Sequence, residues 1–359
     1  MKKIRSMVIL PSYAGGGAER VLLNFLSNSI SKQVSNKLFV ADAKGPLKNY
    51  FLKNQLEFKY SRFIYAIPRL VIEIRKNKID VLISTFPNIS AIILLLKKIK
   101  IHNCKIIIRQ PNMIENSLSK SLKLIILKFF YKKLIHYSDA LIVTSEGMKK
   151  ESLYNHIKEE KIYLLRNPVN ISSIRKNRIP TRNNFKGINL VFVGRLVFQK
   201  GLDRILFTIK KINNIKLTII GEGSEKKKLQ SIIKSIGIEK KVEFLGYVER
   251  PFDRIAGSDY FILPSRWEGL PNCVLESLSL GTPVIAFSEI IALKDYKKNI
   301  SERSIIIVNG EKNLYKELNK LEVRKDYLKP TLRKNLLYKN ISPKEYQQKL
   351  NKLVFNVTK

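Results

Sequence analysis

Two cations with a spacing that suits a diphosphate lie in the second half of the chain, in the stretch FVGRLVFQKGLD. Arg195 comes just after a predicted strand, and Lys200 follows five residues later in the next loop. Ligands of open α/β sheets bind at such strand ends. An arginine fork and a lysine point charge could together stabilise the negative charge on a departing phosphate group. The alternative is an ordinary basic loop in solvent.

The stretch SRWEGLPNCVLESLSLGTPVIA, residues 265–286, combines a helix N-terminus with two carboxylates. Pro271 suits the first turn of a helix, so the backbone N–H groups of Gly269 and Leu270 would face an anion there. Glu268 would lie in the loop before the helix and Glu276 about one turn inside it. Because carboxylates repel a diphosphate, we expect them to accept hydrogen bonds from sugar hydroxyls. Alternatively, Glu268 interacts with the helix dipole and Glu276 is a surface charge.

Three consecutive glycines near the start of the chain raise the possibility of another anion contact. In ILPSYAGGGAERVLLNFL, residues 9–26, a strand pattern passes through Gly15, Gly16 and Gly17 into an amphipathic helix. A phosphate at that helix N-terminus would explain the absence of side chains. The motif is neither the dinucleotide fingerprint nor a P-loop. A sharp turn that needs a positive φ is the alternative.

Strand and helix patterns alternate along both halves of the chain, which predicts parallel sheets. Periodicity lapses at residues 164–189, which indicates a linker. We therefore predict an α/β protein with two Rossmann-like domains that face each other across a cleft. The domains comprise 1–168 and 188–335, with a linker at 169–187 and a helical segment at 336–359. The expected strands are Met7–Pro11, Lys37–Ala41, Ile79–Ser84, Lys105–Arg109 and Ala140–Thr144, then runs that begin at Ile188, Ile215, Lys241, Asp259, Pro283 and Ser304.

The charge balance indicates an anionic partner. The chain of 359 residues has 67 Lys and Arg against 29 Asp and Glu, a formal net charge of +38. Nucleic acid, a lipid surface or a phosphorylated substrate would fit this charge. No zinc-ligand spacing, RNA-recognition motif or basic stretch with interleaved aromatics favours nucleic acid. Cys104 and Cys273 provide no disulfide framework, and no apolar run is long enough to cross a membrane, so we expect a cytoplasmic protein.

In this order and spacing, the motifs resemble the retaining GT-B glycosyltransferases of glycosyltransferase family 4. The resemblance rests on the Gly-Gly-Gly-Ala-Glu turn, on VGRLVFQKGLD, IIGEGSEKKKL and VEFLGYV, and on the two glutamates separated by seven residues. It covers nearly the whole chain. It implies transfer of a sugar from a nucleotide-sugar donor, bound between the domains, with retention of configuration and without a metal. It also implies a C-terminal helix that returns to the first domain.

The resemblance also implies roles for individual residues. Arg195 and Lys200 would hold the diphosphate, Glu276 the ribose and Glu268 the donor sugar, with Arg195, Lys200 and Glu268 acting in catalysis. A UDP-sugar is the expected donor, and no separate cofactor is expected. The chain has no Asp-x-Asp pair for a metal clamp. The donor-binding residues would be Gly16, Gly17, Arg195, Lys200, Glu268, Gly269, Leu270 and Glu276.

Two stretches depart from the family pattern. Many members carry a His after the fourth strand, whereas this chain has Gln110 in IIIRQPNMIE. A glutamine cannot act as general acid or base, but Gln110 and the adjacent Arg109 could contact the acceptor or the transition state. His102 precedes the strand, and we expect it on the surface. AFSEIIALKDYKKN replaces the Gly-rich Pro-Glu segment of the family, and Glu289 within it is a candidate for donor-sugar contact.

The resemblance further implies a pathway and a location. The family frequently uses polyprenyl-linked acceptors, so we expect a hexosyltransferase that acts in bacterial surface polysaccharide (O-antigen or capsule) or glycoconjugate biosynthesis. Its expected partners are a nucleotide sugar, a lipid-linked oligosaccharide and an anionic membrane surface, and not nucleic acid. Sugar-nucleotide epimerase or phosphorylase chemistry on the same fold is the alternative, followed by nucleic-acid binding.

One helical pattern could dock the protein on the inner face of the cell membrane. In residues 117–138, apolar side chains recur at helical spacing among lysines. An interfacial helix has this pattern, but so does a helix that buries its apolar stripe in the core. The apolar set is Leu118, Leu122, Ile125, Ile126, Phe129, Phe130 and Leu134, and the lysines are Lys120, Lys123, Lys128, Lys132 and Lys133.

Overall fold

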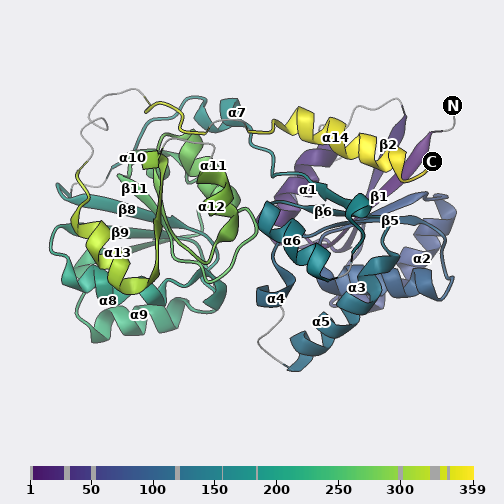
Figure 1. Cartoon of the computed structure of the whole chain (residues 1–359), viewed down its shortest axis with the longest axis horizontal. Helices are drawn as coiled ribbons and strands as arrows, with labels where there is room; N and C mark the ends of the chain where they lie inside the picture. Colours follow the sequence, from purple (N-terminus) through teal and green to yellow (C-terminus); the bar gives the residue numbers. More distant parts are fainter. Residues whose placement is uncertain are drawn as a thin grey trace. The chain divides into compact units, whose positions relative to one another are not determined.

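The computed structural model of the chain describes residues 3–27, 33–49, 54–117, 122–155, 157–182, 185–297, 302–323, 332–337 and 340–359. The chain forms two compact units, whose elements are labelled in Figure 1. Unit 1 consists of Met1–Pro168 together with Ile341–Lys359. Unit 2 consists of Val169–Asn340 and includes the segment predicted as a linker.

Unit 1 is built on a seven-stranded parallel sheet with the order β3-β2-β1-β4-β5-β6-β7. Five of these strands coincide with the predicted ones, but the three-residue edge strands β3 and β7 are not predicted from the sequence. The strands are β1 (Ile4–Ser12), β2 (Val34–Asp42), β3 (Gln55–Glu57), β4 (Val81–Ser84), β5 (Lys105–Arg109), β6 (Ala140–Val143) and β7 (Ile162–Leu164).

Helices cover both faces of this sheet, because alternate residues of each buried strand point to opposite sides. Met7 and Ile9 of β1 pack in a core with α2, α3 and α5, whereas Val8 and Leu10 pack in a second core with α1 and α14. The helices are α1 (Gly17–Ser27), η1 (Phe63–Ala66), α2 (Ile67–Lys76), α3 (Pro87–Lys98), α4 (Ile114–Ser117), α5 (Leu122–Leu134), η2 (Ile135–Tyr137), α6 (Glu146–Tyr154), η3 (Glu159–Lys161) and α14 (Pro343–Asn356).

The helix α14 belongs to unit 1 although it follows unit 2 in the sequence. The side chain of Ser342 caps its first turn by accepting from the backbone N–H of Glu345. Tyr346, Leu350 and Val354 are buried in the core that α14 shares with α1, β1 and β2. The C-terminal helix therefore packs on the first unit, as the family resemblance implies.

Unit 2 contains a six-stranded parallel sheet with the order β10-β9-β8-β11-β12-β13, in which every strand was expected from the sequence. Its strands are β8 (Ile188–Val193), β9 (Ile215–Ile220), β10 (Val242–Gly246), β11 (Tyr260–Leu263), β12 (Val284–Phe287) and β13 (Ile305–Val308). Its helices are α7 (Ile171–Arg175), η4 (Phe198–Lys200), α8 (Asp203–Lys211), α9 (Lys226–Ser235), η5 (Glu239–Lys241), α10 (Phe252–Gly257), α11 (Asn272–Ser279), α12 (Ile291–Lys297), η6 (Glu302–Ser304) and α13 (Gly310–Asn319).

The strand order of each sheet reverses beside its first strand, between β1 and β4 in unit 1 and between β8 and β11 in unit 2. Open α/β sheets bind ligands at such switch points, just beyond the carboxyl ends of the strands. The glycine turn follows β1, the loop with Arg195 and Lys200 follows β8, and the loop with Glu268 follows β11. The topology therefore places the predicted motifs where binding sites form.

Candidate active site

Lys200 and Glu268 form an ion pair where the loops after β8 and β11 meet. The Lys200 Nζ lies 2.5 Å from Glu268 Oε1, and only 13% of the lysine side chain and 8% of the glutamate side chain are exposed. The hydroxyl of Ser265 donates to the same carboxylate oxygen over 3.0 Å, and Gln199 Nε2 donates to the other over 3.4 Å. Three side chains therefore fix the Glu268 carboxylate.

The electrostatics of this pair favour a charged lysine. Burial opposes the charge of Lys200, but the adjacent Glu268 carboxylate outweighs burial, and the pKa of the ammonium lies above its ordinary value. The neighbouring thiol of Cys273 behaves differently, because burial raises its pKa to about 12. Cys273 is therefore protonated at neutral pH and is not a nucleophile there.

The two loops can approach closely because residue 201 is a glycine. Gly201 has a φ of +65°, and a Cβ on it would overlap the carbonyl oxygen of Pro264 in the loop after β11. Arg266 joins the same loops, since its backbone N–H donates to the Gln199 carbonyl over 2.8 Å. Its guanidinium binds both oxygens of Asp203, over 2.9 and 2.6 Å. These contacts fix the position of Lys200 against Glu268.

Arg195 is the exposed cation of the predicted pair. Its charge acts on Lys200, so the two cations are close enough to repel each other. Among the residues that the structure describes, Arg195 has no carboxylate partner, whereas Lys200 is neutralised by Glu268. An arriving anion would therefore meet Arg195 without displacing an existing ion pair.

The helix α11 begins one residue later than predicted. Pro271 has a φ of −74° and a ψ of 125°, an extended conformation, so it is the N-cap and not a residue of the first turn. Gly269 and Leu270 precede it in the loop. Proline has no side chain that can cap the backbone N–H groups of the first turn. Glu276 lies on α11, is half-buried, and acts electrostatically on Cys273.

Glu289, in the loop after β12, is bound by Arg204 of α8. The Arg204 Nη2 lies 2.5 Å from Glu289 Oε1, and its guanidinium carbon lies 4.0 Å from the centroid of the Phe287 ring. The carboxylate is partly exposed at the carboxyl edge of the sheet. Its contact with a donor sugar stays a prediction, and it would compete with Arg204.

The glycine turn after β1 is explained largely by contacts within unit 1. Gly15 has a φ of +78°, and a Cβ on it would lie 2.8 Å from Pro46 Cγ. The alternative of a turn that needs a positive φ therefore explains the glycine at this position. The buried carboxylate of Glu19 occupies the space where a Gly16 side chain would lie. Gly17 is the first residue of α1. A donor contact at Gly16 and Gly17 stays a prediction.

Gln110 is buried at the carboxyl end of β5 and bound to a carboxylate that the sequence analysis missed. Its Nε2 donates to Glu151 Oε2 over 3.2 Å, and its Oε1 has no partner among the described residues. Glu151, on α6, also accepts from the backbone N–H groups of Ile114 and Glu115 over 3.1 and 2.9 Å. Burial raises the pKa of Glu151. No sequence motif links Glu151 to Gln110, because the two residues meet only through the fold.

Arg109 holds the framework of unit 1 together. Only 2% of the residue is exposed. Its Nη1 donates to Thr85 Oγ1 over 3.3 Å and its Nη2 donates to Asn167 Oδ1 over 2.5 Å. Arg109 therefore connects the segments that follow β4 and β7. This placement leaves it almost no surface for the predicted contact with an acceptor.

Two family models match the sequence and meet at residue 173. The description Glycosyltransferase Family 4 applies to residues 15–173, and Glycosyl transferases group 1 applies to residues 173–348. The chain belongs to these glycosyltransferases.

Relatives of this glycosyltransferase include the uncharacterized glycosyltransferase MJ1059 of Methanocaldococcus jannaschii, 34% identical over 64% of this chain and 60% of that protein. The lipopolysaccharide 1,6-galactosyltransferase of Salmonella typhimurium is 31% identical over 42% of this chain and 44% of that protein. These matches thus span about half the length of each relative. Among solved structures, Anabaena HepE in complex with UDP and glucose aligns with a TM-score of 0.77 and 14% identity, over 98% of this chain and 100% of HepE. The fold of both units is therefore GT-B.

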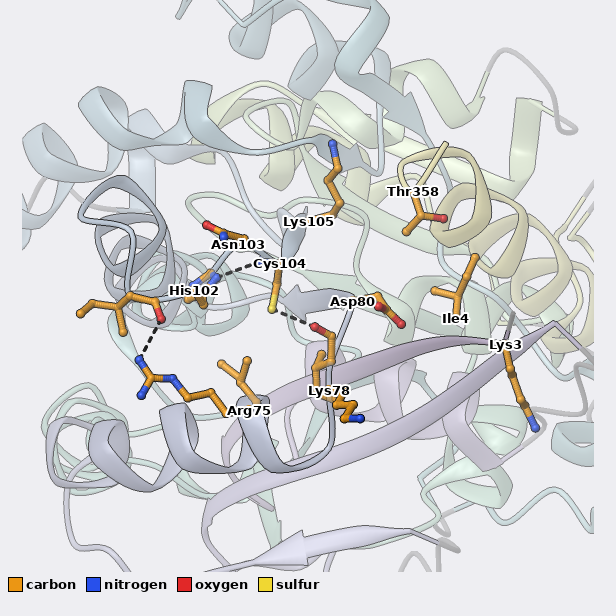
Figure 2. A pocket seen from close by; sticks show the side chains of 13 residues that line it. Lys3, Ile4, Arg75, Lys78, Asp80, His102, Asn103, Cys104, Lys105 and Thr358 are labelled. Atoms are coloured by element: carbon orange, nitrogen blue, oxygen red, sulfur yellow. Dashed lines mark hydrogen bonds between the residues drawn. The ribbon is translucent and has the colours of Figure 1, made fainter. Parts of the chain in front are cut away.

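A cavity of about 630 Å³ lies in unit 1 of the glycosyltransferase, at the edge of the sheet where strands such as β1, β4 and β5 begin. The glycine turn and Gln110 lie at the opposite edge, where these strands end. Figure 2 shows His102 and Cys104 in its wall. The backbone N–H of Cys104 donates to His102 Nδ1 over 3.3 Å, so His102 Nε2 carries the proton and donates to the Ile93 carbonyl over 3.1 Å. The Cys104 thiol donates to the Ile79 carbonyl over 3.1 Å. The prediction of a surface His102 is therefore wrong, because backbone groups satisfy its buried ring.

We expect His102 to make the glycosyltransferase less stable in mild acid. Burial lowers its pKa below the ordinary value of 6.5. The unfolded chain therefore binds a proton on His102 more readily than the folded chain does. The stability of the folded chain that depends on a neutral His102 is fully present above about pH 6.5 and is lost as the pH falls below it. The melting temperature of His102→Gln, measured from about pH 5 to 7.5, should fall less steeply in acid than that of the parent. Equal slopes would contradict this role.

Proposed function

We propose that this glycosyltransferase transfers a hexose from a nucleotide sugar, a UDP-sugar, to a hydroxyl of a lipid-linked glycan with retention of configuration. The product would be part of a bacterial surface polysaccharide, such as O-antigen or capsule, or of another glycoconjugate. The Lys200–Glu268 pair at the carboxyl edge of the unit 2 sheet, with Arg195 nearby, carries the proposal. Two cations and a carboxylate suit a ligand that has both a diphosphate and hydroxyl groups.

Donor binding would exchange the partners within this site. The diphosphate binds Arg195 and Lys200 near the N-terminus of α11, where the helix dipole favours negative charge. Lys200 then shares its charge with the phosphate, which frees one oxygen of Glu268 to accept a hydrogen bond from a hydroxyl of the sugar. Glu276, one turn into α11, accepts from the ribose. The hydrogen bonds from Ser265 and Gln199 keep Glu268 in place during this exchange.

The chemical step breaks the bond between the anomeric carbon and the diphosphate oxygen through an oxocarbenium-like state. Arg195 and Lys200 stabilise the charge that develops on the leaving diphosphate. The acceptor oxygen attacks the anomeric carbon from the same face, and its proton passes to the leaving phosphate oxygen. The protonated thiol of Cys273 and the amide of Gln110 support a route without a protein nucleophile or base at these positions.

The relatives support the partners in this proposal. HepE is described in complex with UDP and glucose, and the Salmonella relative is named for lipopolysaccharide, a glycan on a lipid. We place the enzyme in the cytoplasm, peripherally bound to an anionic inner face of the cell membrane, where a lipid-linked acceptor would be available. Within the described parts of the chain, no helix has the length and apolar character needed to span a bilayer.

The test is a screen of UDP-, GDP- and dTDP-sugars for release of the nucleoside diphosphate, with lipid-linked or free oligosaccharides as acceptors. Release that requires both a UDP-sugar and an acceptor, with a product of unchanged anomeric configuration, is the expected result. Conversion of the sugar nucleotide without an acceptor would instead favour an epimerase. Salt-resistant binding of a labelled nucleic-acid duplex without any nucleotide release would overturn the proposal.

We expect transfer to persist in excess EDTA. The proposal assigns the charge of the leaving diphosphate to Arg195 and Lys200, and the described residues include no group of three or more His, Cys, Asp or Glu that could hold a metal ion. Initial rates of nucleotide release with and without EDTA provide the measurement. A complete loss that manganese restores would contradict this prediction.

Gln110→Ala should reduce turnover less than Lys200→Ala does. A glutamine can orient a hydroxyl but cannot exchange a proton, and Glu151 keeps two backbone donors when the Gln110 donor is lost. We expect a loss of about 1 to 2 kcal/mol in stability, because one buried hydrogen bond disappears. Turnover and urea denaturation of both variants provide the comparison. Equal losses of turnover would assign Gln110 a larger part in the reaction.

A further inference from the structure

The helix α5 has two apolar faces, and only one of them packs on the sheet. Tyr131 and Leu134 are buried in the unit 1 core, and Leu124 and Leu127 pack partly against it. The other face consists of large apolar side chains that are between 48% and 75% exposed, namely Leu122, Ile125, Ile126, Phe129 and Phe130. The stripe predicted from the sequence is therefore largely exposed, except for the buried Leu134, while Leu118 lies outside the described residues.

A neighbouring helix widens this apolar face. In Figure 1, α3 and α5 lie side by side on one side of the unit 1 sheet, and the contacts between them agree. Leu95 and Ile99, at the C-terminal end of α3, are also about half exposed. Large apolar side chains that gather exposed on neighbouring helices are typical of an interaction site. We call the exposed residues of α5 together with Leu95 and Ile99 the α5 face.

The charged side chains of α3 and α5 themselves are all positive. Neither α3 nor α5 contains an Asp or a Glu. Lys123 and Lys133 are exposed and have no carboxylate partner among the described residues, and Lys133 Nζ lies 4.2 Å from the centroid of the Phe129 ring. An apolar stripe edged by lysines suits an anionic lipid surface. It disfavours a second copy of the same face, since that would bring lysines together.

Contacts within unit 1 connect the α5 face to Gln110. Lys128 and Lys132 of α5 both bind the carboxylate of Glu115 on α4. Partial burial opposes the charge of Glu115, but the two lysines hold its pKa below the ordinary value. The backbone N–H of Glu115 in turn donates to Glu151, which binds Gln110. A chain of contacts within unit 1 therefore links the face to the residue expected to contact an acceptor.

We propose that the α5 face inserts its apolar side chains into the headgroup region of an anionic bilayer, with Lys123 and Lys133 on the phosphates. The inference rests on the proposed function, because a lipid-linked acceptor in the same bilayer gives the docking its purpose. Lys128 and Lys132 take no direct part, since Glu115 already holds them. Lys120, which the sequence pattern also includes, lies outside the described residues.

The test is co-sedimentation with vesicles of phosphatidylglycerol mixed with phosphatidylcholine, and with vesicles of phosphatidylcholine alone. The parent should bind the anionic vesicles more strongly and dissociate when NaCl is raised from about 0.1 to about 0.5 M. Phe129→Ser with Phe130→Ser should weaken binding by about 10-fold or more, because two inserted rings are lost. Lys123→Gln with Lys133→Gln should weaken it by about 25-fold, or about fivefold for each lysine.

Matched controls distinguish binding through this surface from nonspecific hydrophobic adsorption and from nonspecific electrostatic attraction. Phe207→Ser removes an aromatic side chain of similar exposure from α8 in unit 2, and Lys132→Gln removes a lysine of α5 that is bound to Glu115. Phe207→Ser should bind like the parent, and Lys132→Gln should lose less binding than Lys123→Gln or Lys133→Gln. The variant that changes Lys120, Lys123, Lys132 and Lys133 together should lose binding at least as fully as the double lysine variant.

Transfer to a short, soluble acceptor provides the second readout. Every docking variant should keep it, while transfer to an acceptor in anionic vesicles should fall with binding. Unchanged vesicle binding in the Phe129 and Phe130 double variant would overturn the docking proposal and leave the glycosyltransferase proposal intact. If the parent does not bind vesicles but is a dimer, and the same double variant is a monomer, the α5 face would instead be assigned to a second copy. If the parent itself releases no nucleotide, that result would contradict the proposed function alone.

Discussion

Lys200→Ala should lower kcat for sugar transfer by about 10- to 150-fold, the equivalent of one charge-assisted hydrogen bond of about 1.5 to 3 kcal/mol. The ammonium that would stabilise the leaving diphosphate is lost, and the Glu268 carboxylate beside it becomes an uncompensated negative charge. Glu276→Ala should cause a loss of similar size, because the donor ribose would lose the acceptor that we propose for it. Release of nucleoside diphosphate at saturating donor and acceptor measures both effects.

Stability and catalysis must be separated in this experiment. Removing one partner of a buried ion pair costs stability as well, so the melting temperature of Lys200→Ala should fall although the hydrogen bonds from Ser265 and Gln199 remain. Lys200→Met combined with Glu268→Gln removes both charges and should regain stability but not activity. Lys226→Ala, which breaks an exposed pair with Glu222 in the same unit, should change neither quantity. Full activity in Lys200→Ala and Glu276→Ala, whatever their melting temperatures, would refute the donor site.

Gly201→Ala should reduce both the stability and the activity of the enzyme. The backbone at this position has a φ of +65°, which costs an alanine about 1 kcal/mol. Its Cβ would also overlap the Pro264 carbonyl oxygen, and this backbone atom cannot rotate away, which adds about 1 to 3 kcal/mol. The added Cβ would push apart the two loops that carry Lys200 and Glu268. Turnover should therefore fall by about 10-fold or more.

Gly237→Ala is the matched control for backbone strain alone. Gly237 has a φ of +72°, but a Cβ on it would have no atom within 4 Å. The free energy of unfolding, from urea denaturation, should fall by only about 1 kcal/mol in this variant, and turnover should be unchanged. Equal effects of Gly201→Ala and Gly237→Ala would show that the contact between the loops has no part in the site.

The sequence predicts the two sheets well because buried parallel strands form short apolar runs bounded by polar turns. Runs such as Lys105–Arg109 are found at the expected residues. The strands β3 and β7 escape prediction because three residues carry too little periodic signal. The same reasoning explains why Arg195, Lys200 and Glu268 could be proposed as one site. Each follows a strand at the switch point, where the topology itself brings distant loops together.

Other parts of the site depend on contacts that no local pattern encodes. Glu151 binds Gln110 across 41 positions in the sequence, and Glu268 binds Lys200 across 68. His102 is buried because two backbone groups happen to satisfy its ring. The periodicity of α5 could not decide which apolar stripe faces the core, because apolar residues occupy two sides of the helix. Only the packing of Tyr131 and Leu134 settles which side is buried.

The position of α14 has a consequence for biosynthesis. A ribosome completes unit 2 before it delivers residues 343–356, although α14 belongs to unit 1. Until then, the nascent chain has α1 over Val8 and Leu10 but lacks the side chains of Tyr346, Leu350 and Val354. Unit 2 is continuous and can finish folding first. Unit 1, although translated earlier, therefore stays open to chaperones and to misassembly for longer than the unit that follows it.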